Sequence, residues 1–429
     1  MPNYLAPGIY VEEVAGGARP IEAVGTSTAG FVGVAPDPQA HLNEYVAITN
    51  WSKFLREFVP EGAESTPLSH AVYGFFENGG SYCYVVNVGE GGSIAGGGRE
   101  RSGLQLFEEV DDIAIVAAPG FTDAASYDAL LGHCEKLKDR VAVLDAPCEV
   151  SDINLLTQVA TVSASSPRRS AADTEEGEGG EASGSPASGS TSGGSSRSTG
   201  LGARASKYGA IYFPCITVRN ALAPNDENGR PNLVSVAPSG HIAGLWARND
   251  ATRGVHKAPA NETLRGALDV SYRLTRAEQD ILNPAGVNCI RLFPREGIRV
   301  WGARTLSSDP EWRYVNVRRL FNMIEESIAE STRWIVFEPN DHTLWKSIRR
   351  DVSAFLTRLW RDGALMGRSP QEAFFVKCDE ETNPPEVIDA GIVMILVGIA
   401  PVKPAEFIVF RISQYEGGVE VETEGGTRA

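Results

Sequence analysis

The two residues best placed for nucleophilic chemistry are Ser239 and His241, in the segment VAPSGHIAG. A hydrolase needs a serine on a strained turn, with a histidine within hydrogen-bonding reach. This segment does not follow the GxSxG pattern, and side chains two positions apart point away from each other on a helix or a strand. We instead expect a helix that begins here, with Ser239 as its N-cap. The residues expected to pack inward from that helix are Ile242, Leu245 and Trp246.

No metal or cofactor site is predicted from the other reactive side chains. The remaining histidines are isolated, without an HxH or HExxH pattern: His41, His70, His133, His256 and His342. The cysteines lie 14 to 89 residues apart with no CxxC pair, which argues against a zinc ribbon or a disulfide framework. Since most have apolar neighbours, we expect buried, inert thiols at Cys83, Cys134, Cys148, Cys215, Cys289 and Cys378.

A nucleotide site is not indicated either. Residues from about 110 to 146 predict strand, helix and strand, which is typical of a βαβ unit in a parallel sheet. The turn after the first strand, PGFTDAAS, matches neither GxGxxG nor GxxxxGKS/T. The glycine-rich stretches at 89–98 and 193–202 lack a following Lys-Ser/Thr pair. The sequence therefore contains no catalytic constellation that would support the alternative of an α/β hydrolase or a nucleotide-binding enzyme.

The composition is that of a folded, acidic protein. Of its 429 residues 42% are hydrophobic, and the net charge is −16 at pH 7, which argues against duplex nucleic acid as a partner. No stretch reaches the roughly 20 apolar residues of a membrane span, and we expect the longest apolar run, 390–402, to be a buried strand. The first residues, MPNYLAPGIYVEEV, lack the parts of a signal peptide, so we expect synthesis and assembly in the cytoplasm.

The elements of the N-terminal half are predicted by local patterns. In residues 1–20 prolines and glycines disfavour helix, while IYVEEV alternates as a strand does. GTSTAGFVGVAP predicts a buried strand, WSKFLREF and SHAVYGFFENGG predict short helices, and SYCYVVNV predicts a second strand. A flexible glycine-rich segment, 89–103, leads to the strand–helix–strand unit, whose helix is expected at about 123–138.

One long segment interrupts the body. Residues 163–206 are rich in Ser, Gly and Ala and carry an acidic block, and such a composition buries too little surface to offset the entropy of ordering. We expect a disordered surface loop that projects outward. The following segment, KYGAIYFPCITV, predicts a strand that rejoins the same sheet.

The C-terminal half predicts two amphipathic helices and a terminal strand. Apolar side chains recur at helical spacing from Val317 to Ile328 and from Leu344 to Leu359. Solvation alone accounts for a charged helix face, but four cations lie opposite the apolar face of the second helix: Lys346, Arg349, Arg350 and Arg361. The segment PAEFIVFRISQY alternates as a strand does. Like the N-terminal strand, it has nothing local to pair with.

Six blocks of the sequence resemble the contractile tail sheath family, which includes the sheaths of contractile phage tails, R-type pyocins and related injection systems. The blocks are LAPGIYVEEV (5–14), HKAPANE (256–262), LNPAGVNCIR (282–291), GIRVWGARTL (297–306), WRYVNVRRLF (312–321) and APVKPAEFIVFRISQ (400–414). The resemblance covers the N-terminal arm and nearly everything from about 205 onward. It is weaker in 90–150 and absent from the Ser/Gly-rich segment.

The resemblance implies an α/β (mixed α+β) fold. This would be a subtilisin-like core without the subtilisin active site, with a parallel-type sheet flanked by helices, a smaller inserted outer domain and extended strand arms at both ends. It also implies a structural subunit, not an enzyme, that polymerises with itself as stacked hexameric rings around an inner tube. Contraction would then drive the tube through a target membrane. Baseplate and terminal cap proteins would be further partners, without direct membrane insertion, in a particle that is cytoplasmic, released or part of a virion.

In this family each terminal arm adds a strand to a neighbour's sheet. The residues expected to form these linking strands are Ile9, Tyr10, Val11, Val14, Phe407, Ile408, Val409, Phe410 and Ile412. In the same context the cationic helix face would contact an acidic tube, because solvated charge pairs are individually weak and can release on contraction. A tube, baseplate or surface-layer protein would be the rival in the same class, and it would lack both arms and the WGARTL and YVNVRRL blocks.

The expected organisation follows the chain in order. Its parts are an N-terminal arm (1–20), a first part of the sheath region (21–88), a Gly-rich linker (89–103), the βαβ portion of the core (104–162), the surface loop (163–206), the remainder of the core (207–290), a C-terminal sheath domain with the tube-facing helix (291–404), and a C-terminal arm with an acidic tail (405–429).

Overall fold

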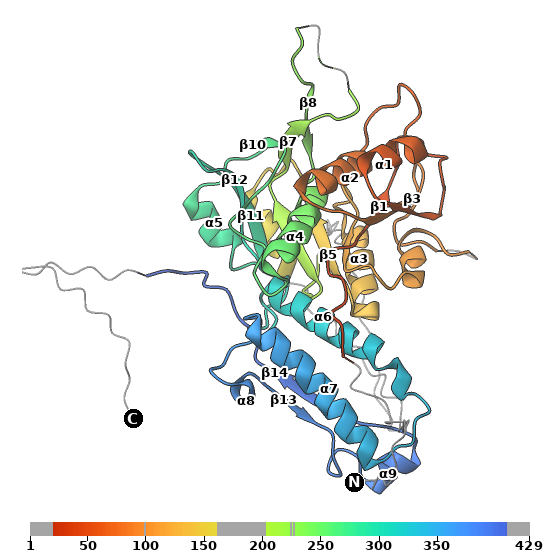
Figure 1. The fold of residues 1–429 in the computed structure, drawn as a ribbon. Helices are drawn as coiled ribbons and strands as arrows, with labels where there is room; N and C mark the ends of the chain where they lie inside the picture. The colour runs from red at the N-terminus through yellow and green to blue at the C-terminus, as the bar shows by residue number, and fades with distance from the viewer. Residues whose placement is uncertain (1–19, 98–99, 161–202, 224, 226–227, 410–429) are drawn as a thin grey trace, which may run out of the picture.

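The computed structural model describes residues 20–97, 100–160, 203–223, 225 and 228–409. Figure 1 shows an α/β core and, below it, an elongated unit formed by the C-terminal helices and a small hairpin. The sequence predicted a mixed α/β protein, and this is confirmed.

A nine-stranded mixed sheet forms the centre of the core, in the order β2-β3-β1-β4-β5-β6-β11-β12-β9. The strands from β3 to β11 pair in parallel, while β2, β12 and β9 pair antiparallel at the two edges. The bounds are β1 Ala29–Gly33, β2 Tyr45–Ile48, β3 Cys83–Asn87, β4 Ile115–Ala117, β5 Val141–Asp145, β6 Gly209–Phe213, β9 Glu262–Thr263, β11 Val287–Phe293 and β12 Gly297–Trp301.

Helices cover both faces of this sheet, as parallel strands require. One face packs against α1 (Trp51–Phe58), α2 (Pro67–Asn78) and α4 (Ser239–Arg253). The other face packs against η1 (Gly103–Glu109), α3 (Ala124–Leu137), η2 (Ile153–Ala160) and the last residue of α5 (Arg276–Leu282). Burial on both sides explains why the central strands are continuous apolar runs: every residue of β1, β4, β5 and β6 is buried.

Local signals set the helix ends as predicted. Asp123 caps α3 by accepting the backbone N–H of Ser126 at 3.0 Å, and Lys138 ends it in the left-handed conformation. Gly79 ends α2 in the same conformation, which glycine adopts without steric cost. The strand–helix–strand unit is confirmed, since β4 and β5 pair in parallel with α3 between them.

The prediction for 207–218 was correct only in its first half. β6 rejoins the large sheet by pairing in parallel with β5. After the cis peptide bond between Phe213 and Pro214, the chain leaves that sheet. It enters a three-stranded antiparallel sheet made of β7 (Ile216–Arg219), β8 (Leu233–Val236) and β10 (Ala267–Val270). One predicted strand is therefore two strands in two sheets.

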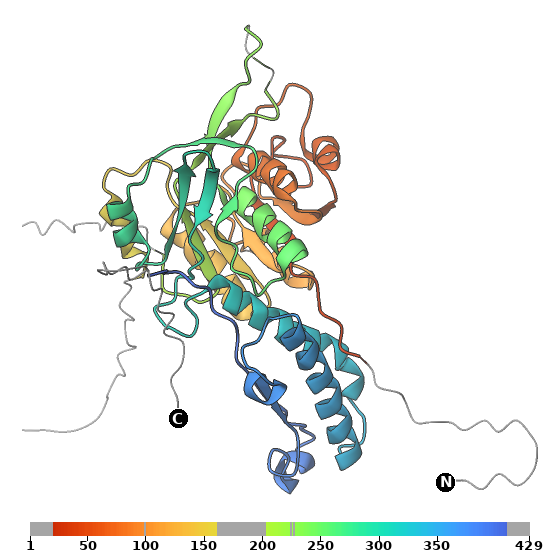
Figure 2. The same ribbon diagram turned by 60° about the vertical axis from the view of Figure 1, so that its left-hand side comes forward.

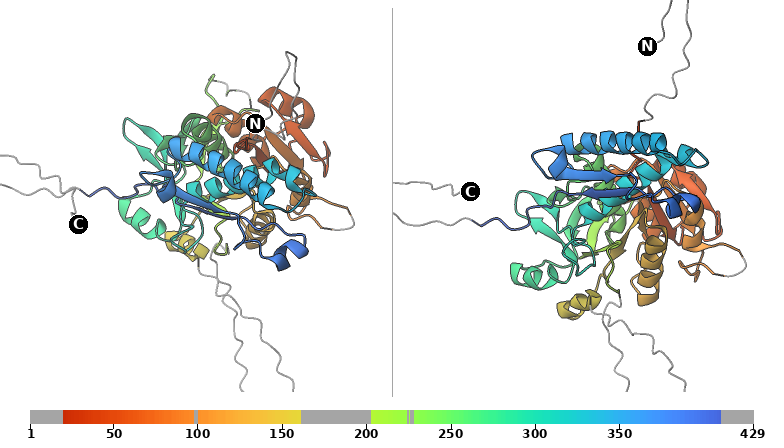
Figure 3. Two further views of the ribbon diagram at one scale, coloured as in Figure 1. Left: turned by 60° about the horizontal axis from the view of Figure 1, so that its bottom comes forward. Right: turned by 90° about the horizontal axis from the view of Figure 1, so that it is seen from below.

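The C-terminal unit has a core of its own. The long helices α6 (Val315–Ser331) and α7 (His342–Arg361) lie side by side in Figures 2 and 3. The residues predicted to form the apolar face of α7 are buried, including Trp345, Val352 and Phe355. The remaining elements are η3 (Arg333–Ile335), α8 (Pro370–Ala373), β13 (Phe374–Lys377), α9 (Pro385–Asp389) and β14 (Leu396–Ile399).

Three sequence predictions are wrong in detail. The apolar run 390–402 is not a buried strand: only β14 is regular, and Ile392, Met394 and Leu396, which precede or begin that strand, are about half exposed. The last residues of the predicted surface loop 163–206 belong to the core instead, since Ala203 and Ser206 are buried. Cys148 and Cys215 form a disulfide with Cα atoms 5.1 Å apart, because the parallel pairing of β5 with β6 brings their ends together. The other four cysteines are buried free thiols, as expected.

Two predicted divisions of the chain fall inside the large sheet. The Gly-rich segment 89–103 connects strands that both pair with β1, and Ile94 within it is buried. The division at 290/291 falls inside β11. None of the described helices is long and apolar enough to cross a membrane.

Candidate assembly interface

The Ser239–His241 segment is a packing site. Ser239 is the first residue of α4 and not its N-cap, which is Pro238. The Asp145 carboxylate accepts the Ser239 backbone N–H at 2.7 Å and the Ser239 hydroxyl at 2.6 Å. Burial raises the pKa of Asp145 to about 6. Because Ser239 is fully buried, its hydroxyl cannot reach a substrate.

His241 faces helix α2 and also has no access to solvent. A methyl group in place of the Gly74 hydrogen would lie 2.2 Å from its Nδ1, so α2 and α4 are in close contact here. Neither ring nitrogen has a hydrogen-bond partner among the described residues, and burial lowers the pKa of His241 to about 4. His241 is therefore a neutral core residue. Within the described part of the chain, no group of three or more His, Cys, Asp or Glu residues is arranged to hold a metal ion.

The C-terminal arm leaves the body in an extended conformation. Its first predicted linking residues, Phe407, Ile408 and Val409, are 75%, 74% and 79% exposed. The other linking residues lie outside the described residues: Ile9, Tyr10, Val11, Val14, Phe410 and Ile412. Three large apolar side chains in a row that the rest of the described chain leaves exposed are a strong candidate for an interface.

Glu406, directly before these apolar residues, anchors the arm to the core. Its carboxylate accepts hydrogen bonds from Arg304 Nη2 at 2.6 Å and Nε at 2.9 Å, from Asn283 Nδ2 at 2.8 Å and from the Tyr314 hydroxyl at 3.1 Å. These hydrogen bonds keep the pKa of Glu406 below its ordinary value although burial alone would raise it. A forked ion pair in a partly dry site fixes orientation as well as position.

Sequence reasoning missed this anchor, although its signal was present. Arg304 lies in the block GIRVWGARTL, Asn283 in LNPAGVNCIR and Glu406 in APVKPAEFIVFRISQ. Tyr314 lies in a fourth block, WRYVNVRRLF, so four of the blocks that carried the resemblance meet at one carboxylate.

The hairpin of β13 and β14 is the second candidate surface. The two strands pair antiparallel over four residues, from Phe374↔Ile399 to Lys377↔Leu396. No third strand of the described chain joins them. Phe375 and Leu396 are 54% and 52% exposed. A two-stranded sheet is marginal alone in water, and its open edges are templates for further strands.

The four cations of α7 are all solvent-exposed: Lys346, Arg349, Arg350 and Arg361. Figure 3 shows α7 at the edge of the molecule, away from the large sheet. Two qualifications come from their neighbours. Arg350 Nε donates to Asp351 at 2.9 Å, and Lys346 and Arg349 line a shallow pocket with three acidic residues, Asp379, Glu380 and Glu381. Arg361 is the cation of this face with no ion-pair partner or acidic pocket beside it among the described residues.

Comparison with known proteins identifies the family. The chain matches the phage tail sheath protein central domain over residues 187–306 and the phage tail sheath C-terminal domain over 307–414. The tail sheath protein of Escherichia phage P2 is 30% identical over 174 residues, which is 39% of this chain and 42% of that protein. The tail sheath protein of Salmonella phage ViI is 26% identical over 336 residues, 75% of this chain and 48% of that protein. The matched part thus spans less than half the length of these two curated relatives.

Solved structures match over nearly the whole chain. A sheath complex of the extracellular contractile injection system PVC, in its contracted state, has a TM-score of 0.73 and 27% identity, over 96% of this chain and 99% of that one. The helical sheath of the anti-feeding prophage, also contracted, has a TM-score of 0.70 and 29% identity, over 96% and 99%. A chain of the anti-feeding prophage baseplate is 30% identical, with a TM-score of 0.68, over 96% and 100%. The chain therefore belongs to the phage tail sheath family, as a structural sheath subunit of a phage tail or of a related contractile injection system.

Proposed function

We propose that this subunit polymerises with itself as stacked hexameric rings around an inner tube, and that contraction of the stack drives the tube through a target membrane. The similar chains come from a contracted helical sheath and from a six-fold symmetrised baseplate, which supports both self-assembly and a baseplate partner. Terminal cap proteins would complete the particle, which is cytoplasmic, released or part of a virion.

One observation carries this proposal: within the described residues, the body presents a sheet of only two strands, and the C-terminal arm presents exposed apolar residues that pair with no strand. We propose that the arms of neighbouring copies add strands to the β13–β14 hairpin. An arm of five or six residues makes about five backbone hydrogen bonds, each worth about 0.5–1.5 kcal/mol net. Added strands would also cover the exposed side chains of Phe375 and Leu396. Strand addition therefore joins subunits by a flexible link, so that rings stay connected while their bodies rotate.

The cationic face of α7 is proposed to contact the tube. Exposed charges suit a contact that must hold in one state and release in the other, since each pair is weak and screened by salt. Arg361 is the cation on which this proposal depends most, because the neighbouring acidic side chains already lie beside the other three.

We also propose the domain layout predicted above, with two changes. The surface loop is 163–202, because Ala203 packs in the core. The C-terminal sheath domain begins near residue 307, after β12, where the second family match begins. The α/β body is then the subtilisin-like core, the smaller three-stranded sheet belongs to the inserted outer domain, and the Ser/Gly-rich loop projects outward.

Removal of the arms tests the proposed function. Purified full-length chain is compared by negative-stain microscopy and sedimentation with two variants, one lacking residues 1–19 and one lacking 407–429, which retains the Glu406 anchor. We expect rings or tubes from the full chain and folded, unpolymerised protein from both variants. Polymers of normal appearance from either shortened chain would contradict strand exchange by that arm.

A further inference from the structure

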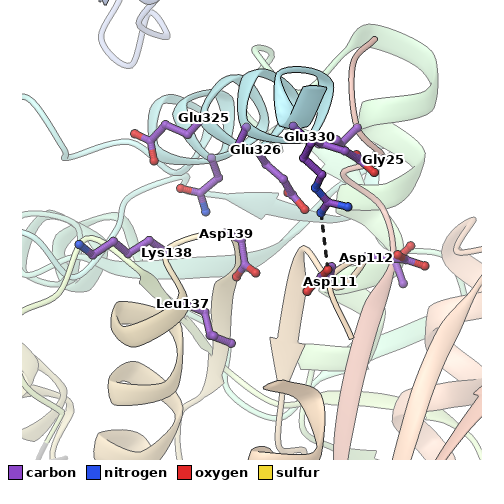
Figure 4. Close-up of a pocket in the computed structure, with 14 residues that line it drawn as sticks. Gly25, Asp111, Asp112, Leu137, Lys138, Asp139, Glu325, Glu326 and Glu330 are labelled. Atoms are coloured by element: carbon purple, nitrogen blue, oxygen red, sulfur yellow. Dashed lines mark ion pairs between the residues drawn. The ribbon is translucent and has the colours of Figure 1, made fainter. Parts of the chain in front are cut away.

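An acidic cleft of about 630 Å³ lies where α6 meets the core. Figure 4 shows carboxylates of α6 on one wall and those from the end of α3 and the loop before β4 on the other. The acidic residues that line it are Asp111, Asp112, Asp139, Glu325, Glu326 and Glu330, against the cations Lys138 and Arg333. Arg333 is 3.9 Å from Asp111, Arg140 pairs with Asp139, and Arg318 pairs with Glu325. Among the described residues this leaves Asp112, Glu326 and Glu330 without a cationic partner.

Two side chains in this cleft are incompletely satisfied. Asn322, which is 4% exposed, lines the cleft and uses its Oδ1 to accept a hydrogen bond from Arg318 Nε at 2.6 Å. Its Nδ2 has no acceptor within the described chain, and a buried donor without an acceptor is unfavourable. Burial, together with Asp139 and Glu330, raises the pKa of Glu326 to about 7 although Arg140 opposes this shift. A ligand that brings both a cation and a carbonyl oxygen would satisfy the two groups at once.

We propose that this cleft receives the turn between β11 and β12 of a neighbouring copy, with Arg295 of that copy placed among the cleft carboxylates. This inference rests on the proposed self-assembly. Arg295 is exposed at the tip of the turn, in the left-handed conformation, and has no ion-pair partner among the described residues. The backbone carbonyls of the same turn are acceptors for Asn322 Nδ2. Between residues 291 and 299 the β11–β12 hairpin carries three arginines against one acid, Glu296, which pairs with Arg299 at 3.3 Å, so the hairpin is net positive.

The position of the two surfaces fits a head-to-tail contact. In Figures 1 and 3 α5 and the β11–β12 hairpin lie at one edge of the core, whereas α3 lies nearer its middle. Two different, complementary patches at separate places on a subunit generate a ring or a helix. The basic side also faces a neighbour on independent grounds. Phe407 and Ile408 of the C-terminal arm share a groove there with Arg276 and Arg291.

Other segments of the chain are poorer occupants of an acidic cleft. Residues 1–19 carry two acidic side chains against one basic, 161–202 carry five against three, and 410–429 carry four against two. Each would add negative charge. A tube that binds the cationic face of α7 would be acidic, and would also be repelled. The basic edge of a second copy is therefore the occupant that charge complementarity favours.

Charge exchange tests this contact in the full-length protein. Arg295→Glu and Glu330→Arg each place like charges together, and we expect each to raise the concentration needed for polymerisation at least about tenfold. The double variant restores opposite charges at every contact and should recover most of the wild-type behaviour. Arg56→Glu, at an exposed position of α1, is the matched control and should polymerise normally. Thermal unfolding of each variant establishes that the subunit is folded.

A second measurement locates the contact directly. Arg295→Cys combined with Ala329→Cys, an exposed residue that lines the cleft, should form disulfide-linked ladders in polymers but not in dilute monomer. Polymerisation of both single charge variants at wild-type concentrations, or no recovery in the double variant together with no cross-link, would overturn the contact while leaving strand exchange intact. A wild-type chain that stays monomeric under all conditions would overturn both.

Discussion

The Arg304 guanidinium holds the Glu406 carboxylate through two hydrogen bonds, of 2.6 and 2.9 Å, across 102 residues of sequence. The side chains of Arg304 and Glu406 are 11% and 19% exposed, so the pair is largely shielded from water. The arm that begins at Phe407 is therefore attached to the α/β core, and a pull on the arm acts on the core directly.

We expect Glu406→Gln to weaken assembly more than it weakens the fold. The change removes the charge partner of a mostly buried arginine, which costs about 1–3 kcal/mol where the group stays buried, and less where the arm root can move into water. Chemical denaturation and the critical concentration for polymerisation measure the two effects. Lys403→Gln, an exposed change on the same segment, is the control. Equal assembly of the Glu406→Gln variant and the wild-type chain would show that the anchor does not contribute to polymerisation.

Reversal of Arg361 tests the tube contact. Arg361→Glu should abolish extended particles when sheath and tube are mixed, while sheath self-assembly persists, because the residue is exposed and has no intramolecular ion pair in the described chain. Electron microscopy of co-assembled particles is the readout, with Arg56→Glu on α1 as an exposed control. Normal extended particles with Arg361→Glu would count against a tube-facing α7.

Deletion of residues 163–202 should leave both fold and assembly intact. The deletion stops before Ala203, which packs in the core, and before Arg204, which pairs with Asp128 and Glu135 at 2.7 and 2.6 Å. A longer deletion, 163–206, removes these contacts and should lower the unfolding temperature. If the shorter deletion prevents polymerisation, the loop takes part in assembly and does not simply project outward.

The disulfide between Cys148 and Cys215 should stabilise the isolated subunit. It closes a loop of 67 residues, for which the loss of unfolded-state entropy predicts about 4 kcal/mol. Denaturation with and without reductant measures the difference. The Cys148→Ser, Cys215→Ser double variant should have the same stability as the reduced wild type, and reductant should not change its stability. A wild-type stability that does not change on reduction would contradict this contribution.

Acid should destabilise the subunit through its buried histidines. Burial lowers the pKa values of His70, His133 and His241 to about 4, below the usual 6.5. As the pH falls from 6.5 to 4, these histidines become protonated in the unfolded chain but stay neutral in the folded one. Each histidine therefore lowers the free energy of unfolding by up to about 1.4 kcal/mol per pH unit. The raised pKa values of Asp145 and Glu326 act in the opposite direction, adding stability as these groups are protonated in the fold.

A single variant isolates the histidine effect. His241→Leu removes two ring nitrogens that lack partners in the described chain, and it should reduce the pH dependence of unfolding between pH 6.5 and 4 by about one proton. The comparison with wild type cancels the contributions of Asp145 and Glu326. An unchanged slope would mean that His241 is protonated in the fold.

Local patterns predicted the elements better than they predicted the surfaces. The spacing of apolar residues from Leu344 to Leu359 was sufficient to predict α7 and its buried face, because one face of an amphipathic helix packs against the core. The disulfide could not be predicted from spacing, since Cys148 and Cys215 meet only once β5 and β6 pair. An apolar run usually predicts burial, but Met394 and Leu396 are exposed. The sequence pattern alone cannot distinguish residues of the subunit's own core from surface residues that another chain covers.

The β13–β14 hairpin has a consequence for how growth ends. If each added subunit fills one open sheet and brings another, the end of the polymer is chemically the same after every step. The subunit itself therefore does not determine the length of the polymer. The length of the polymer would be set by another component, such as the structure around which it assembles or a protein that binds the last open sheet and blocks further addition. Excess free subunits could also start polymers without the other components. Correct assembly would therefore depend on when the subunit is synthesised.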